Sequence, residues 1–145
     1  MHNTNIENIK FQIQEIDKLL KHYAGLLNKK EMHDSVELAA LAGVLHSFYN
    51  GLERIFIEYL KKENVIIPTG KNWHKSLIDC LFLPNESGKL LLPLNYKEVI
   101  IEYLSFRHFY RHSYSFYLNW EDMKHLCIGL KSNWKNIKKY LNNNI

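Results

Sequence analysis

The segment from Arg107 to Tyr114 holds most of the chemistry that this chain could perform. It reads RHFYRHSY, so two arginines, two histidines and two tyrosines lie within eight residues. Arginine carries a permanent charge and a planar fork that binds phosphate through two hydrogen bonds. Histidine gains and loses a proton near neutral pH. Cleavage of a phosphodiester needs one group that holds the anion and one that moves a proton, so the segment indicates that chemistry.

Arg107 and His112 are the candidate catalytic residues, and their spacing restricts how they can act together. Five residues of an ideal helix turn through about 140° net, so the two side chains diverge. One straight helix therefore cannot direct both at one phosphate. Either the helix ends after Tyr110 and the chain bends, or two copies of the chain meet and build one site.

Arg107 also needs a partner inside the fold. It follows the apolar residue Tyr103 by one helical turn, so we expect it at the edge of the interior, where an unpaired charge is costly. Glu53, on an earlier helix, is the predicted partner. A purely structural Arg–Glu pair between helices is the alternative interpretation of Arg107.

A metal site is the competing chemical interpretation of the same segment. His108 and His112 stand four residues apart, as zinc ligands on a helix often do. No third and fourth ligand accompany them, since His46 and Cys127 would have to come from other helices. Arg107 and Arg111 would repel a cation. We therefore expect no metal and no cofactor.

The elements that must position these residues are helices. Apolar residues recur at alternating three- and four-residue spacing in several stretches, and no stretch alternates at a spacing of two. Polar residues suited to helix starts occur near Asn72, in the capping-box pattern Asn95-Tyr-Lys-Glu98, and at Asn119. The sequence predicts an all-α, up-down bundle of four long helices and one short helix, in one domain over residues 1–145. The expected helices cover residues 6–27, 41–59, 72–80 and 119–141, with a further helix that opens at Asn95 and continues through Tyr103.

Composition excludes several classes of protein. A chain of 145 residues with 46% hydrophobic residues is neither disordered nor too short for a core. No stretch approaches the roughly 20 apolar residues of a membrane span, and the start lacks the pattern of a signal peptide. We expect a cytoplasmic protein without membrane contact, with Cys80 and Cys127 as reduced core thiols. The net charge of +4 permits an anionic partner.

The spacing R-x4-H-x-Y, with the helical pattern around it, resembles the HEPN superfamily and, within it, the HepT-like toxins. Residues 41–53 (LAGVLHSFYNGLE) and 72–77 (NWHKSL) look like the second-helix and third-helix segments of that family, in the same order. The resemblance covers roughly residues 35–141.

The resemblance implies a HEPN-like helical fold and a metal-independent ribonuclease. Members form homodimers in which the motifs face each other across a two-fold axis. Arg107 would bind and stabilise the scissile phosphate, with Arg111 in a supporting role, and His112 would act as general acid or base on the ribose 2′-hydroxyl. Tyr114 would accept AMP from an MntA-like nucleotidyltransferase antitoxin, as in a type VII-like toxin–antitoxin system. The tethered AMP would place an anion where the substrate phosphate binds.

Two functions from different classes follow. The first is a toxin that cleaves RNA, with tRNA as one candidate substrate, and that is neutralised by adenylylation of Tyr114. The alternative is a non-catalytic helical subunit that binds substrate for, or regulates, a minimal nucleotidyltransferase, with the charged segment mainly structural.

Overall fold

The chain folds into an all-helical bundle, which confirms the predicted fold class. The computed structural model describes residues 2–31 and 33–145, and within these ranges no strand forms. The elements in chain order are α1 (His2–His22), α2 (Ala24–Asn28), α3 (Ser35–Lys62), α4 (Trp73–Leu81), α5 (Tyr96–Arg111), the 3₁₀ turn η1 (Ser115–Tyr117) and α6 (Trp120–Asn144).

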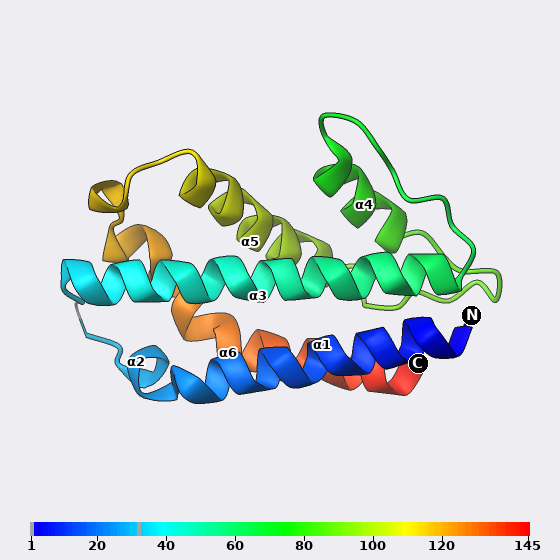
Figure 1. Cartoon of the computed structure of the whole chain (residues 1–145), viewed down its shortest axis with the longest axis horizontal. Coiled ribbons are helices and arrows are strands. Elements are labelled where there is room, and N and C mark those ends of the chain that lie inside the picture. The colour runs from blue at the N-terminus through cyan, green and yellow to red at the C-terminus, as the bar shows by residue number, and fades with distance from the viewer. Residues whose placement is uncertain (1, 32) are drawn as a thin grey trace.

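Helix α3 is the centre of the bundle. It crosses the middle of the molecule, with α1 along one side and with α4 and α5 along the other (Figure 1). A capping box begins it: the Asp34 side chain accepts from the Glu37 amide at 2.8 Å, and the Asp34 amide donates to the Glu37 carboxylate at 3.1 Å. At Gly51 the neighbouring helix comes so close that a Cβ atom would lie 2.9 Å from Ile16. Only glycine fits this contact between α1 and α3 without displacing Ile16.

The predicted first helix, residues 6–27, is interrupted at Tyr23 and becomes α1 and α2. Tyr23 leaves the helical region (φ −102°, ψ 17°), and Gly25, a poor helix former, follows two residues later. The apolar stripe nevertheless continues across the break, because Leu20 and Leu27 are both buried. The spacing therefore predicted the buried face correctly and the continuity of the helix wrongly.

Helices α4, α5 and α6 begin where the polar residues predicted. Asn119 caps α6 by accepting from the Glu121 amide at 2.8 Å. Asn72 and Asn95 precede α4 and α5 but make no side-chain cap, so the predicted capping box at Asn95 does not form. Asn95 already has helical dihedrals, and the amide of the next residue, Tyr96, bonds the Pro93 carbonyl at 3.0 Å. A preceding turn thus satisfies the amide at the start of α5.

The core joins α3, α5 and α6 around Phe48. Its ring packs edge-on against Tyr103 of α5 (centroids 5.2 Å apart) and against Trp134 of α6 (6.0 Å). The buried Tyr103 hydroxyl donates to the Leu126 carbonyl at 2.8 Å, and the Trp134 indole donates to Asp17 of α1 at 2.7 Å. The two contacts of Tyr103 fix α5, which carries the charged segment, against α3 and α6.

Replacing Phe48 with alanine is expected to lower the free energy of unfolding by about 3–5 kcal/mol, the usual cost of removing a buried aromatic ring. Phe48 is fully buried and contacts rings on two other helices, so collapse cannot fill the cavity cheaply. Urea unfolding followed by circular dichroism measures the change. Phe11→Ala, at a half-exposed ring on α1, is the matched control and should cost much less. Equal losses in the two variants would contradict this account of the core.

Both cysteines are free thiols, as the sequence predicts. Cys127 is buried, and burial raises the pKa of its thiol to about 12. Cys80 is only half-buried, so it lies at the margin of the core rather than inside it. Among the described helices, none is long and apolar enough to cross a membrane.

Candidate active site

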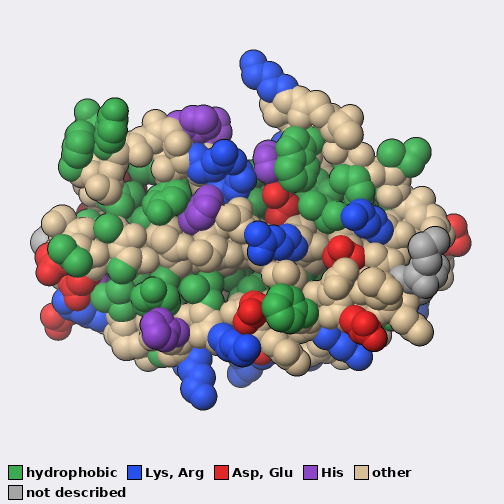
Figure 2. Space-filling model, in the orientation of Figure 1, with side chains coloured by type: hydrophobic (Ala, Val, Ile, Leu, Met, Phe, Trp, Pro, Cys, Tyr) green, Lys and Arg blue, Asp and Glu red, His purple; other side chains and the backbone are tan. Residues whose placement is uncertain are grey.

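A basic groove lies between the start of α4 and the second half of α5. Its volume is about 640 Å³, and of its ten lining residues, all in the described part of the chain, none is acidic. Figure 2 shows Lys or Arg side chains and His side chains gathered on this side of the molecule. Seven of the ten are cationic or histidine: Lys71, His74, Lys75, Arg107, His108, Arg111 and His112. A groove with this lining attracts anions.

The end of α5 resolves the problem of the five-residue spacing. The helix stops at Arg111, one residue later than the predicted break after Tyr110, and His112 caps it with φ −116° and ψ 13°. The His112 amide bonds the Phe109 carbonyl at 3.2 Å, a tighter turn than the α-helix makes. Arg107 and His112 therefore line the same groove within one chain.

Arg107 is held by Asn50 rather than by Glu53, so the predicted partner is wrong. The Arg107 Nε donates to Asn50 Oδ1 at 2.9 Å. Glu53 lies one turn further along α3, is buried with 7% of its surface exposed, and contacts His74 Nδ1 at 2.7 Å. Because Asn50 is neutral, it positions the guanidinium without cancelling its charge. The bond to Asn50 uses the Nε and not the two terminal nitrogens, the fork that grips phosphate, and Arg107 lines the groove.

Three polar residues on one face of α3 form a network that contacts the side chains lining the groove. His46, Asn50 and Glu53 recur at four and three residues, on one face of the helix. The Asn50 Nδ2 donates to His46 Nε2 at 3.1 Å, and the His46 ring lies 4.8 Å from the ring of Tyr110. The chain of contacts thus runs from His46 through Asn50 to Arg107, while Glu53 holds His74.

Asn50 was not predicted as a site residue, and His46 was considered only as a metal ligand recruited from another helix. The signal that would reveal them is a polar side chain at helical spacing inside a stretch that is otherwise buried. This polar spacing on α3 becomes informative only once α5 is known to cover that face of α3.

His46 is electrostatically unusual. Burial lowers its pKa from the ordinary 6.5, and the positive charges of Arg107 and Arg111 lower it further. His46 therefore remains neutral as an acceptor for Asn50 at a pH where a free imidazole would begin to charge.

This lowered pKa predicts a pH dependence of stability. Below pH 6.5 the unfolded chain binds a proton at His46 that the folded chain resists, so the free energy of unfolding falls as the pH falls. A His46→Gln variant, which keeps an acceptor for Asn50, should lose less stability between pH 7 and pH 5 than the wild type does. Urea unfolding at both pH values measures the difference. His125→Gln, at an exposed histidine, is the control, and an unchanged pH dependence in His46→Gln would contradict the prediction.

Tyr114 lies beside the groove and does not line it. It follows the end of α5 by three residues in an extended conformation, and 72% of its surface is exposed. With Phe109 and Ser113 it borders a neighbouring hollow of about 260 Å³. Arg111, the predicted supporting residue, does line the groove. The side chain of Tyr114 is therefore largely exposed to solvent.

His108 and His112 are in contact, with ring centroids 4.6 Å apart. In the described ranges no group of three or more His, Cys, Asp or Glu side chains is arranged to hold a metal ion. The pair lines the groove with Arg107 and Arg111.

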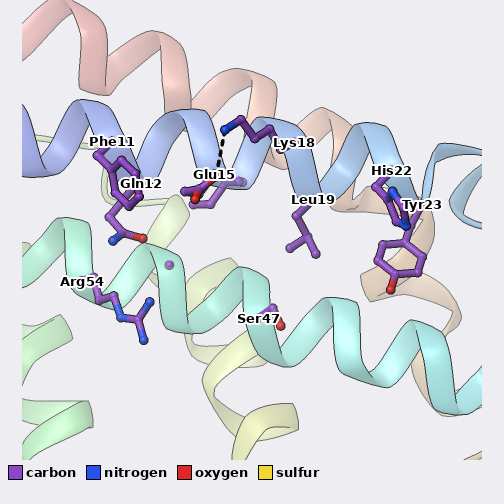
Figure 3. A pocket seen from close by; sticks show the side chains of 11 residues that line it. Phe11, Gln12, Glu15, Lys18, Leu19, His22, Tyr23, Ser47 and Arg54 are labelled. Atoms are coloured by element: carbon purple, nitrogen blue, oxygen red, sulfur yellow. Dashed lines mark ion pairs between the residues drawn. The ribbon is translucent and has the colours of Figure 1, made fainter.

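A second cavity, of about 510 Å³, lies between α1 and α3 (Figure 3). Phe11, Gln12 and Leu19 of α1 face Ser47 and Arg54 of α3 across it. It shares no lining residue with the basic groove. Arg54 therefore offers a control for substitutions of the arginines in the groove.

Comparison with known proteins gives one family. The model of a family described as HepT-like protein matches residues 40–145, close to the 35–141 expected from the sequence. Neither a curated protein nor a solved structure matches the chain significantly. The matched region begins inside α3 and includes α4, α5, η1 and α6, and therefore the whole basic groove. Since this region makes up most of the chain, the protein belongs to the HepT-like family.

Proposed function

We propose that this protein is a toxin-type endoribonuclease that cleaves RNA in the groove between α4 and α5. HepT-like proteins are generally ribonucleases of the HEPN superfamily. The observation that carries the proposal is that Arg107 and His112 line one groove whose other charged residues are cationic. An RNA backbone carries one negative charge per nucleotide, so such a groove suits it.

The chemistry is a transfer of the phosphoryl group within RNA. Arg107 binds the non-bridging oxygens of the scissile phosphate and stabilises the charge that develops on them. His112 takes the proton from the ribose 2′-hydroxyl, whose oxygen attacks phosphorus. The bond to the 5′-oxygen breaks, and that oxygen is protonated as it leaves. Arg111, Lys71 and Lys75 hold neighbouring phosphates.

The active form in this proposal is a homodimer. Protonation of the leaving 5′-oxygen requires a second proton-transfer group, and a second copy meeting at a two-fold axis brings another His112 to the same cleft. The end of α5 supports this arrangement, because His112 lines the groove and is exposed.

The proposed control of the toxin is adenylylation of Tyr114 by an MntA-like nucleotidyltransferase antitoxin in the cytoplasm. The exposure of Tyr114 and its position two residues after His112 support the proposal. AMP attached there adds a phosphate close to Arg107 and Arg111, and this phosphate competes with RNA for the same cations.

Expression in a bacterial host tests the proposed function. Production of this protein alone should arrest growth, and the purified protein should cleave RNA in the presence of EDTA. Co-expression with the cognate nucleotidyltransferase should restore growth and add the mass of AMP to the peptide that contains Tyr114. Full growth and intact RNA with the folded wild-type protein would overturn the ribonuclease assignment and favour a non-catalytic subunit. Loss of cleavage in EDTA would overturn the metal-independent mechanism alone.

A further inference from the structure

Three aromatic side chains project from the turn that connects α5 to α6. Tyr114, Phe116 and Tyr117 expose 72%, 73% and 62% of their surface. Large exposed rings gathered in one place are uncommon on a monomeric domain and mark a surface that binds something. In Figure 2 hydrophobic side chains stand out at the end of the molecule where η1 lies.

Backbone hydrogen bonds close the turn that carries these rings, and the rings lie against one another. The Tyr117 amide bonds the Tyr114 carbonyl at 3.0 Å, and the Leu118 amide bonds the Ser115 carbonyl at 3.1 Å. The rings of Tyr114 and Phe116 are parallel within 5°, with centroids 5.4 Å apart, and the ring of Tyr117 lies 4.6 Å from that of Phe116. The buried Trp120 anchors the turn on the side of α6. The turn therefore brings the three rings into contact with one another while most of their surface stays exposed.

The turn is continuous with the basic groove. Tyr114 follows His112 by two residues, and His112 lines the groove. A cationic groove that tracks a phosphate backbone, next to aromatic rings on which bases stack, is the usual combination in proteins that bind single-stranded nucleic acid. The exposed side chains of the turn are aromatic, and aromatic rings favour a flat π-system such as a nucleobase as the ligand.

We infer that the turn formed by Tyr114, Phe116 and Tyr117 is a nucleobase-binding platform. It stacks an unpaired base of the RNA strand whose phosphate lies in the groove at Arg107. Bases of a duplex are already stacked on their neighbours, so the platform selects single-stranded segments. This inference rests on the proposed function for the position of the phosphate, and it adds a binding subsite outside the Arg107–His112 pair.

The test measures stacking directly, without cleavage. A single-stranded oligodeoxynucleotide containing 2-aminopurine lacks the 2′-hydroxyl, so it binds without being cut, and its fluorescence falls when an aromatic ring stacks on the base. Phe116 is the position to change, because Tyr114 is the proposed AMP acceptor. Phe116→Leu keeps an apolar side chain and removes the ring, and it should weaken binding about 5- to 150-fold and abolish the quenching. Phe116→Tyr should restore both, and Phe11→Leu on α1 should change neither.

The outcomes separate this inference from the proposed function. Binding and quenching that depend on Phe116, in a protein that cleaves no RNA, would sustain the platform and overturn the ribonuclease. Cleavage with an unchanged KM in Phe116→Leu, together with unchanged quenching, would overturn the platform and leave the ribonuclease intact. A shift from dimer to monomer in sedimentation of Phe116→Leu, with the affinity for the oligonucleotide unchanged, would assign these rings to contact between copies of the chain and would overturn the platform.

Discussion

Replacing Arg107 with alanine is expected to reduce the kcat/KM for RNA cleavage by about 10²- to 10³-fold, the usual cost of removing one donor that stabilises developing charge. Asn50 holds the guanidinium by its Nε at 2.9 Å, so the fork is oriented before RNA arrives. Initial rates on a fluorescent RNA oligonucleotide, with folding checked by circular dichroism, measure the effect. Because Asn50 loses its donor, the variant should also be about 1 kcal/mol less stable.

Two further variants make this result specific. Arg54→Ala removes an exposed arginine from α3, in the separate cavity between α1 and α3, and should leave cleavage nearly unchanged. Arg107→Lys keeps the positive charge but loses both the planar fork and the Nε donor, so it should recover only part of the activity. Full activity in a folded Arg107→Ala protein would show that Arg107 is a structural link to Asn50 and nothing more.

Replacing His112 with alanine is expected to reduce kcat by about 10²- to 10⁴-fold, the range that a positioned proton-transfer group contributes. His112 is the cap of α5 and is exposed, so its removal should affect the stability of the fold little. RNA affinity should persist, because Arg107, Arg111, Lys71 and Lys75 still line the groove. Single-turnover cleavage with saturating protein, beside a binding measurement, separates the two effects.

Neighbouring histidines supply the controls for His112. His125→Ala removes an exposed histidine that pairs with Glu102, away from the groove, and should have no effect on cleavage. His108→Ala removes the ring in contact with His112 and should reduce the rate only modestly. A larger loss in His108→Ala than in His112→Ala would transfer the proton-transfer role to His108. Undiminished cleavage in both variants would overturn the assignment of a histidine.

Much of the fold could be predicted from local pattern. The three-and-four spacing of apolar residues located the long helices, because each helix must bury one face. The same reasoning missed the break at Tyr23, since a one-residue interruption keeps Leu20 and Leu27 on the buried side. It also predicted a capping box at Asn95 that the preceding turn makes unnecessary.

The sequence predicted which residues line the candidate site but not which residues contact each other there. The residues Arg107, Arg111 and His112 could be chosen from their types and spacing, and all three line the groove. The prediction of Glu53 as the partner of Arg107 failed because Asn50, the observed partner, lies three positions away on the same face of α3. Which of the two residues contacts Arg107 depends on the position of α5 along the axis of α3, and no local sequence pattern encodes that position. His74, which binds Glu53, comes from a third helix.

The segment from Arg107 to Tyr114 thus determined by itself which functional groups are available, because charge, proton affinity and aromaticity belong to the side chains. Only the tertiary structure decided how they are arranged. In the folded chain α5 ends at Arg111, and His112 lines the groove. Arg107 bonds Asn50, and the side chain of Tyr114 is exposed. The physical reason is that the hydrophobic pattern specifies which face each helix buries, whereas the packing of α3, α4 and α5 sets their relative positions, and these positions determine every contact between helices.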